Sequence, residues 1–154
     1  MHFLMKLSPR DDVFERVDNM NSLSRALFGI TVLAGQPAAA QNLVLDTPTV
    51  VANIDVVCTG AGLDAREDPR WRAYGLKVEV AGEGGKYLGN ENVDLRRDGN
   101  LLLTVTCAGP WLLFRLPPGR YEVEARIGNQ TASSAAFVPL EGQGRIVLRF
   151  SESD

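Results

Sequence analysis

The stretch that decides the fold is GPWLLFRLPPGRYEVEA, residues 109–125. Proline restricts φ and glycine permits a tight turn, so Pro117-Pro118-Gly119 predicts a rigid corner between two strands. Beyond this corner, apolar and charged residues alternate from Tyr121 to Ile127, which is typical of a strand with one buried and one solvated face. We expect the remaining strands to pack around this pair.

Other short β patterns, separated by turn residues, occur on both sides of this stretch. They predict strands at 52–58, 76–80, 92–96, 101–107, 131–138 and 145–150. Asp98-Gly99 lies between two of these runs and indicates a hairpin, because a tight hairpin turn needs positive φ. The sequence therefore predicts an all-β fold: a single antiparallel β-sandwich of about seven strands in residues 52–150, with a tail at 151–154.

The large aromatic side chains are the expected centre of this sandwich. We predict that Trp111, Phe114, Tyr121 and Phe150 are buried in one layer. Burial of one Phe-sized side chain contributes about 1.5–3 kcal/mol. Trp111, Phe114 and Tyr121, with the Pro117-Pro118-Gly119 corner, are therefore assigned a structural role.

Residues 63–74 interrupt the β pattern with a charged segment. Asp64 is a suitable N-cap, and Pro69 limits a helix here to a turn or two. We predict one short helical turn. Trp71 and Tyr74 are expected to close the open end of the core, because a domain of this size needs its large aromatic residues for burial.

Residues 20–40 have the three parts of a signal peptide. Arg25 precedes an apolar run at 26–34, and Ala38 and Ala40 fit a cleavage site before Gln41. The apolar run is shorter than the roughly 20 residues that span a bilayer. We predict export to the periplasm or the medium after cleavage near Ala40, in preference to a buried helix of the mature fold.

The segments on either side of this signal are less regular. Residues 1–19 are acidic where the start of a signal peptide is basic, so they are either an extension or the result of a wrongly assigned start before Met20. A loose helix is expected around residues 23–33. Residues 41–51 contain Pro48 and are predicted to be a linker or a first edge strand.

Composition excludes several classes of function. The chain has 154 residues, 45% of them hydrophobic, which suits a single globular domain. Its net charge is -3, and nucleic-acid binding normally needs a basic stripe. The single histidine, His2, precedes the predicted cleavage site, so the mature chain lacks histidine-based catalysis and His-ligated zinc. We expect no catalytic residue, no metal and no cofactor.

Three acids provide the remaining candidate chemistry: Asp64, Glu67 and Asp68. A hydrolase that uses a carboxylate pair needs only two acids. Arg66 and Arg70 lie between and beside them, however, which favours a solvated, ion-paired turn. The spacing also differs from that of a recognised calcium loop. Trp71 and Tyr74, with Tyr87, offer an alternative as an aromatic strip for a glycan or peptide. The candidate binding surface is therefore Asp64, Glu67, Asp68, Trp71 and Tyr74.

Cys58 and Cys107 are expected at strand ends, each with a glycine within two residues. In an oxidising compartment such a pair favours a disulfide over two buried thiols. Closing a loop of about 50 residues would stabilise the fold by roughly 4 kcal/mol in the entropic model.

The residues around the corner also carry a resemblance. Gly109-Pro110-Trp111 and Leu116-Pro117-Pro118-Gly119-Arg120-Tyr121-Glu122-Val123 resemble the LPPGxYxV signature of carboxypeptidase regulatory-like domains, which are transthyretin-like (prealbumin-like) β-sandwiches. The similarity extends over roughly residues 75–150, and the two cysteines depart from it. It implies the fold, and relatives among small exported bacterial proteins of undefined function, but it implies little about activity.

These observations together predict an exported, non-enzymatic accessory or binding module of the cell envelope. A glycan- or peptide-binding sandwich and a carboxylate-dependent hydrolase are the alternatives. The expected partner is another envelope protein or a glycan, with no nucleic acid and no membrane span in the mature chain.

Overall fold

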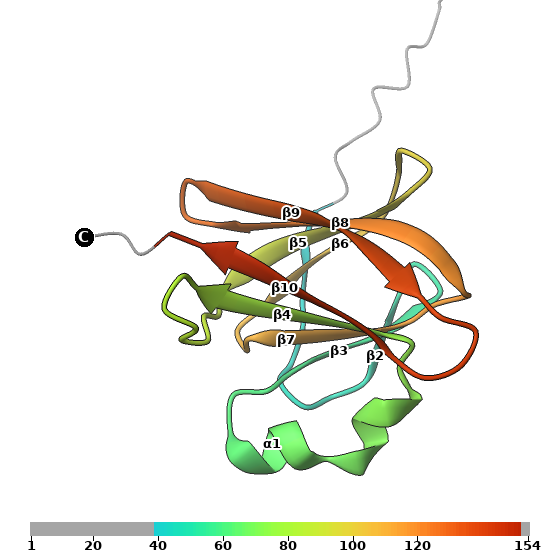
Figure 1. The fold of residues 1–154 in the computed structure, drawn as a ribbon, viewed down its shortest axis with the longest axis horizontal. Coiled ribbons are helices and arrows are strands. Elements are labelled where there is room, and N and C mark those ends of the chain that lie inside the picture. The colour runs from blue at the N-terminus through green and yellow to red at the C-terminus, as the bar shows by residue number, and fades with distance from the viewer. Residues whose placement is uncertain (1–38, 152–154) are drawn as a thin grey trace, which may run out of the picture. The chain divides into compact units, whose positions relative to one another are not determined.

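The computed structural model describes residues 39–151, which form two five-stranded sheets (Figure 1). The first sheet has the order β1-β6-β5-β8-β9, and the second has the order β10-β4-β7-β3-β2. The elements are β1 (Gln41–Asn42), β2 (Thr49–Val51), β3 (Ile54–Thr59), α1 (Leu63–Glu67), η1 (Pro69–Ala73), β4 (Leu76–Gly82), β5 (Glu91–Arg97), β6 (Asn100–Cys107), β7 (Trp111–Arg115), β8 (Gly119–Ile127), β9 (Gln130–Val138) and β10 (Gly144–Phe150).

The predicted all-β sandwich is confirmed, with more strands than the seven expected. Residues 41–51 contain two short strands, β1 and β2, which lie at the edges of the two sheets. Not every pairing is antiparallel, because β1 pairs with β6 and β10 pairs with β4 in parallel. The predicted N-terminal extension, signal peptide and loose helix, and the tail beyond Ser151, lie outside the described residues.

The turn between β5 and β6 confirms the predicted hairpin. Asp98 and Gly99 have φ values of 51° and 77°, as a tight primed turn requires. The register of the two strands shifts between Leu95 and Arg96, which marks a β-bulge.

The Pro117-Pro118-Gly119 corner carries the chain from β7 in the second sheet to β8 in the first. Gly119 has a φ of 143°, in the region that favours glycine. The Tyr121 hydroxyl donates a hydrogen bond to the Pro117 carbonyl at 2.8 Å and accepts one from Arg97 at 3.1 Å. A tyrosine that ties its hydroxyl back to the preceding corner is a known device of β-sandwiches.

The main core lies between the two sheets and includes Phe114, Tyr121 and Phe150, as predicted. Trp111 was predicted to share this layer, and that prediction is wrong. Leu112 and Phe114 point into the core, so Trp111, at odd spacing from them, points to the outer face of β7. Trp111 is nevertheless buried, because other groups cover that face.

The helical segment, α1 and η1, lies on the outer face of the second sheet, away from the first sheet (Figure 1). Trp71 and Tyr74 pack there on Val57 and Leu113 and form a second, smaller cluster. They were expected to close the open end of the main core, and that prediction is wrong, because they cover the outer face of the second sheet instead. The N-cap of α1 is Gly62, and Asp64 lies in the first turn.

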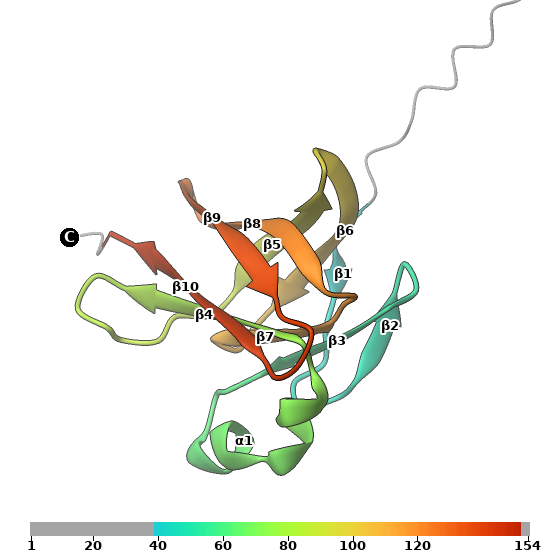
Figure 2. The same cartoon turned by 45° about the vertical axis from the view of Figure 1, so that its right-hand side comes forward.

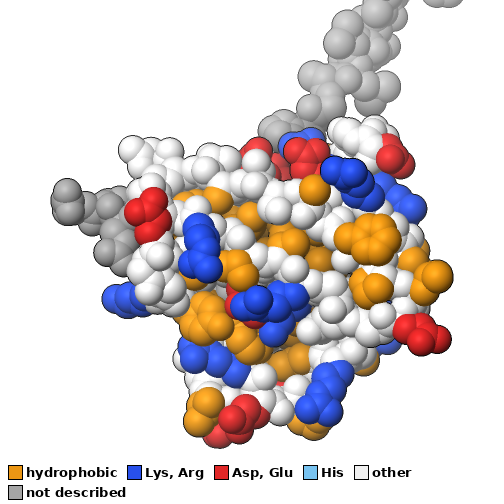
Figure 3. Space-filling view, viewed as in Figure 1, with side chains coloured by type: hydrophobic (Ala, Val, Ile, Leu, Met, Phe, Trp, Pro, Cys, Tyr) orange, Lys and Arg blue, Asp and Glu red, His pale blue; other side chains and the backbone are white. Residues whose placement is uncertain are grey.

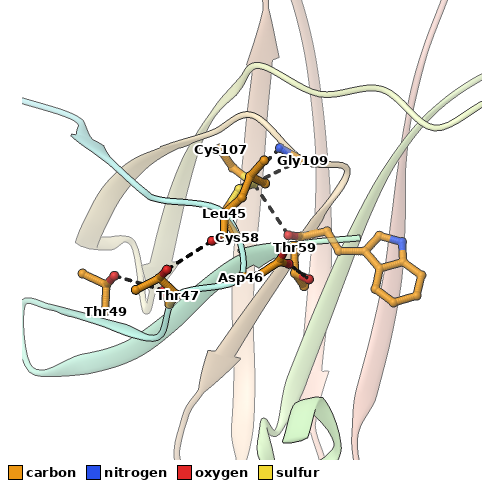
Figure 4. Close-up of a disulfide and its surroundings, with 9 residues drawn as sticks. Leu45, Asp46, Thr47, Thr49, Cys58, Thr59, Cys107 and Gly109 are labelled. Carbon is orange, nitrogen blue, oxygen red and sulfur yellow. Dashed lines mark hydrogen bonds between the residues drawn. A yellow bond between two sulfur atoms is a disulfide. The ribbon is translucent and has the colours of Figure 1, made fainter. Parts of the chain in front are cut away.

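The predicted disulfide between Cys58 and Cys107 is confirmed, with an S–S distance of 2.08 Å (Figure 4). It connects β3 of the second sheet with β6 of the first. Gly109 passes close beside it, and its backbone amide lies 3.4 Å from the Cys58 sulfur. A Cβ atom on Gly109 would lie 2.5 Å from the Thr59 carbonyl oxygen, so this close approach requires glycine.

Such a bridge is typical of proteins that fold outside the reducing cytosol. Within residues 39–151, no helix is long and apolar enough to cross a membrane.

Candidate functional site

A groove of about 400 Å³ is lined by residues of the helical segment and of the outer face of the second sheet, with Gln143 from the loop before β10. Its walls combine two indole rings with acids, bases and an amide. The lining residues are Arg66, Glu67, Asp68, Trp71, Arg72, Lys77, Trp111 and Gln143. We call this feature the Trp groove, because both tryptophans of the chain line it.

Trp111 sits where β7 meets the groove, and its ring is packed on several sides. The Lys77 ammonium lies 4.3 Å from the ring centroid, within the range of a cation–π contact. The Tyr87 ring meets it edge-on, with the centroids 6.0 Å apart. A Cβ atom on Gly60 would lie 2.6 Å from Cγ of Trp111, so glycine at this position, with φ at 85°, leaves room for the indole. The ring is thus held in a fixed orientation at the groove.

Glu79 anchors Lys77 in this arrangement. The Lys77 ammonium lies 3.1 Å from a Glu79 carboxylate oxygen, and Arg145 donates to both oxygens at 2.7 and 2.8 Å. The Tyr87 hydroxyl lies 3.3 Å from the same carboxylate. Burial alone would raise the pKa of Glu79, but the hydrogen bonds from Arg145 and Lys77 outweigh it and hold the pKa below its ordinary value. Glu79 is therefore ionised at neutral pH.

Arg66 joins the helical segment to the sheet at the other side of the groove. Its guanidinium donates to the Gly60 carbonyl at 2.8 Å and lies 4.5 Å from the centroid of the Tyr87 ring. Figure 3 shows that Lys and Arg side chains lie among hydrophobic ones over the second sheet and the helical segment. The groove lining thus includes three cationic side chains, those of Arg66, Arg72 and Lys77, beside the two acids.

The structure brings some of the predicted site residues together and separates others. Glu67, Asp68 and Trp71 line the Trp groove. Asp64 is exposed on α1 and does not line it. Tyr74 is buried and lines a different hollow, of about 470 Å³, which Trp71 also lines.

Asp68 has a structural task as well. Its carboxylate accepts a hydrogen bond from the Arg70 backbone amide at 2.9 Å, which caps η1, and it binds the Arg70 guanidinium at 2.7 Å. The side-chain hydrogen bond from Arg70 lowers the pKa of Asp68. A general acid needs a pKa raised toward neutrality, so Asp68 is suited to accept hydrogen bonds rather than to donate a proton.

Among the described acids, the one with the largest pKa shift, Glu91, lies outside the Trp groove. Glu91 begins β5, opposite Cys107 of β6, and its side chain is buried with neither oxygen hydrogen-bonded to a described residue. Burial raises the pKa of Glu91 to about 8. It lies within the sandwich and does not line the Trp groove. Across residues 39–151, no group of three or more His, Cys, Asp or Glu side chains is arranged to hold a metal ion.

A larger cleft, of about 510 Å³, opens at one end of the sandwich. Its lining includes apolar side chains such as Leu88, Ile127 and Phe150, and Lys86 is the one charged side chain among the described residues that line it. The Trp groove is smaller, but it concentrates aromatic and charged groups. For this reason we regard the Trp groove as the candidate site.

Sequence reasoning missed Lys77, Glu79 and Arg145. Lys77 and Glu79 alternate with apolar residues, so the pattern predicts only that they share a solvated face. Arg145 reaches Glu79 because β10 pairs in parallel with β4, and no short-range pattern indicates that pairing. Glu91 did carry a signal, because it falls at the same alternation as Val93 and Leu95, which face the core.

Comparison with known proteins adds no family to this description. No protein-family model matches the chain, and a search of curated proteins gives no match. The resemblance to carboxypeptidase regulatory-like domains stays a prediction.

Proposed function

We propose that the chain is an exported, non-enzymatic binding module of the cell envelope that holds a glycan in the Trp groove. The observation that carries this proposal is the lining of the groove, where two indoles stand beside acids, bases and an amide within about 400 Å³. Binding sites typically combine an apolar lining with a few well-placed polar groups that fix orientation.

A glycan suits this lining better than an anion does. A hydroxyl group both donates and accepts hydrogen bonds, and the groove offers the carboxylates of Glu67 and Asp68 as acceptors and the guanidinium of Arg72 as a donor. An anionic ligand would use the cations and be repelled by the two acids. Trp71 and Trp111 line the groove and would contribute apolar contacts to a sugar ring.

Three further observations support export and an accessory role. The sequence predicts a signal peptide at 20–40, and the Cys58–Cys107 bridge suits an oxidising compartment such as the periplasm or the medium. The resemblance to carboxypeptidase regulatory-like domains agrees with an accessory module. A binding role is also favoured because Asp68 is held by Arg70 and is ionised at neutral pH.

Intrinsic fluorescence provides a direct test, because both tryptophans line the groove. The full chain is titrated with a panel of oligosaccharides that includes peptidoglycan fragments. We expect at least one to shift the emission saturably. Glu67→Gln and Arg72→Ala should each weaken its binding about tenfold, which corresponds to about 1.4 kcal/mol.

The matched control is Asp64→Asn, which alters an exposed acid of the same helix that does not line the groove. Its affinity should equal that of the unaltered chain. No binding across the panel, or equal binding by the Glu67 and Arg72 variants, would contradict the proposal. Retention of an envelope protein by the chain, with no glycan bound, would favour the protein-partner alternative.

A further inference from the structure

The four edge strands of the sandwich differ in how well they are protected from pairing with another chain. Exposed edges are templates for pairing, and proteins usually shorten them or place charges on them. β1 and β2 are only 2 and 3 residues long, and β10 carries Arg145 and Arg149. β9 lies at an edge of the first sheet (Figure 2), and it has 9 residues, none of them charged. Its register with β8 contains no bulge.

We propose that β9 pairs antiparallel with β9 of a second copy of this chain. The first sheet of each copy then joins the other to form one continuous sheet. The turn before β9 fixes which of its backbone groups are available. Ile127 pairs with Gln130 across the two residues Gly128 and Asn129, and Gly128 has a φ of 58°. This is a two-residue hairpin with a primed turn, whose closing pair is hydrogen-bonded.

Hydrogen-bonded and non-hydrogen-bonded pairs alternate along an antiparallel ladder. Because Gln130 belongs to a bonded pair, so do Ala132 and Ser134, and their backbone groups face β8. Those of Thr131, Ser133 and Ala135 point away from the sheet. Within the described part of the chain, no backbone–backbone hydrogen bond outside the β8–β9 ladder involves these three residues, and the Ala135 carbonyl accepts one from the Ser134 hydroxyl at 2.9 Å.

The open edge extends over residues 131–135. Beyond it, the Phe137 carbonyl lies against Gly144 at the start of β10, so that end of β9 is covered. The exposed side chains of the open stretch are those of Thr131, Ser133 and Ala135. All are small, and none is charged.

This stretch is complementary to itself. With a two-fold axis at Ser133, the backbone of Ser133 bonds to Ser133 of the other copy, and Thr131 bonds to Ala135 of the other copy. Small uncharged side chains then lie opposite one another, and a hydroxyl pair meets at the axis, which stabilises cross-strand pairs. These matches favour a second copy over an unrelated peptide as the partner.

The test is the oligomeric state of the full chain, measured by sedimentation equilibrium over a range of concentrations. We expect a dimer whose amides at 131, 133 and 135 become protected from hydrogen exchange as the concentration rises. Ser133→Lys places two like charges at the axis and should weaken dimerisation at least tenfold, with an unchanged circular dichroism spectrum. Val50→Lys, at an exposed position of the β2 edge, is the matched control and should dimerise normally.

A pair of variants with opposite charges shows whether a loss of the dimer comes from repulsion at the axis or from misfolding. Ser133→Lys and Ser133→Glu should each be monomeric alone, and an equal mixture of the two should restore the dimer. A monomeric unaltered chain at all concentrations would overturn the proposal, and so would a dimer that Ser133→Lys leaves intact. Pairing of β9 with an extended peptide, without any dimer, would also overturn it.

Discussion

Glu79 and Glu91 are both almost completely buried, and their surroundings shift their pKa values in opposite directions. Glu79 lies on the outer face of the second sheet, where Arg145, Lys77 and Tyr87 surround its carboxylate. Glu91 lies inside the sandwich without a hydrogen-bond partner among the described residues.

The comparison distinguishes two causes of a pKa shift, namely burial of the carboxyl group and its hydrogen bonds to charged partners. Loss of hydration disfavours the charged form of both carboxyl groups. At Glu79 the charged neighbours overcome this penalty, and at Glu91 nothing opposes it effectively. Glu79 should therefore stabilise the fold at neutral pH, whereas Glu91 should destabilise it.

The largest expected effect comes from Glu91→Gln. The folded-state pKa of Glu91 is raised from 4.5 to about 8, so the native state holds a proton that the unfolded state releases. Stability should fall as pH rises through that window, by about 1.4 kcal/mol per pH unit. Glutamine removes this dependence, so the variant should be more stable than the unaltered chain at pH 7 by on the order of 3 kcal/mol.

Urea unfolding at pH 5, 7 and 8.5, without reductant, measures this difference. It should be small at pH 5 and reach its full value near pH 8. An equal difference at the three pH values would mean that Glu91 titrates normally, and the contrast with Glu79 would then disappear.

The second largest effect on stability is expected from Glu79→Gln, and it has the opposite sign. The variant loses charge-assisted hydrogen bonds from Arg145 and Lys77, and we expect it to be less stable by about 2 kcal/mol at pH 7. The pKa of Glu79 is lowered, so its stabilisation is present above 4.5 and is lost as pH falls through the folded-state pKa. Thermal unfolding at pH 7 and pH 3 tests both points, because the difference in stability between the two proteins should be smaller at pH 3 than at pH 7.

The smallest effect should come from Arg145→Ala. The Arg145 side chain is 57% exposed, and Lys77 and Tyr87 remain beside Glu79 when it is removed. We expect a loss of about 1 kcal/mol or less. Arg149→Ala removes an exposed arginine of the same strand and should change stability by less than about 0.5 kcal/mol. If the two variants are equally stable, Arg145 does not contribute to the contrast between the two glutamates.

The sequence predicted those parts of the fold that local chemistry decides. The Asp98-Gly99 hairpin and the Pro117–Gly119 corner depend on residues that allow or restrict particular φ values, and both are present. The burial of Phe114, Tyr121 and Phe150 was also predicted correctly.

The parts that local pattern could not predict depend on contacts between distant residues. Residues 111–114 of β7 are buried on both faces of the strand, so apolar and polar residues do not alternate along it. For this reason Trp111 was assigned to the wrong face. The network around Glu79 requires a strand pairing with β10, whose Arg145 lies 66 residues away. Three of the five predicted surface residues line the Trp groove, but five of the eight residues in its lining, Lys77 and Trp111 included, were not predicted as a site.

The Cys58–Cys107 bridge also determines how the chain would respond to mechanical force. The bridge closes a loop with a sequence separation of 49, so tension on the two ends cannot extend that loop, and full extension is shortened by roughly 170 Å. Arg66, Trp71 and Lys77 lie inside the closed loop, whereas Trp111 lies outside it. Tension that detaches β7 from β3 and β4 would therefore remove Trp111 from the Trp groove, while Arg66, Trp71 and Lys77 stay in the segment that the bridge closes. Mechanical force would in this way disrupt the Trp groove.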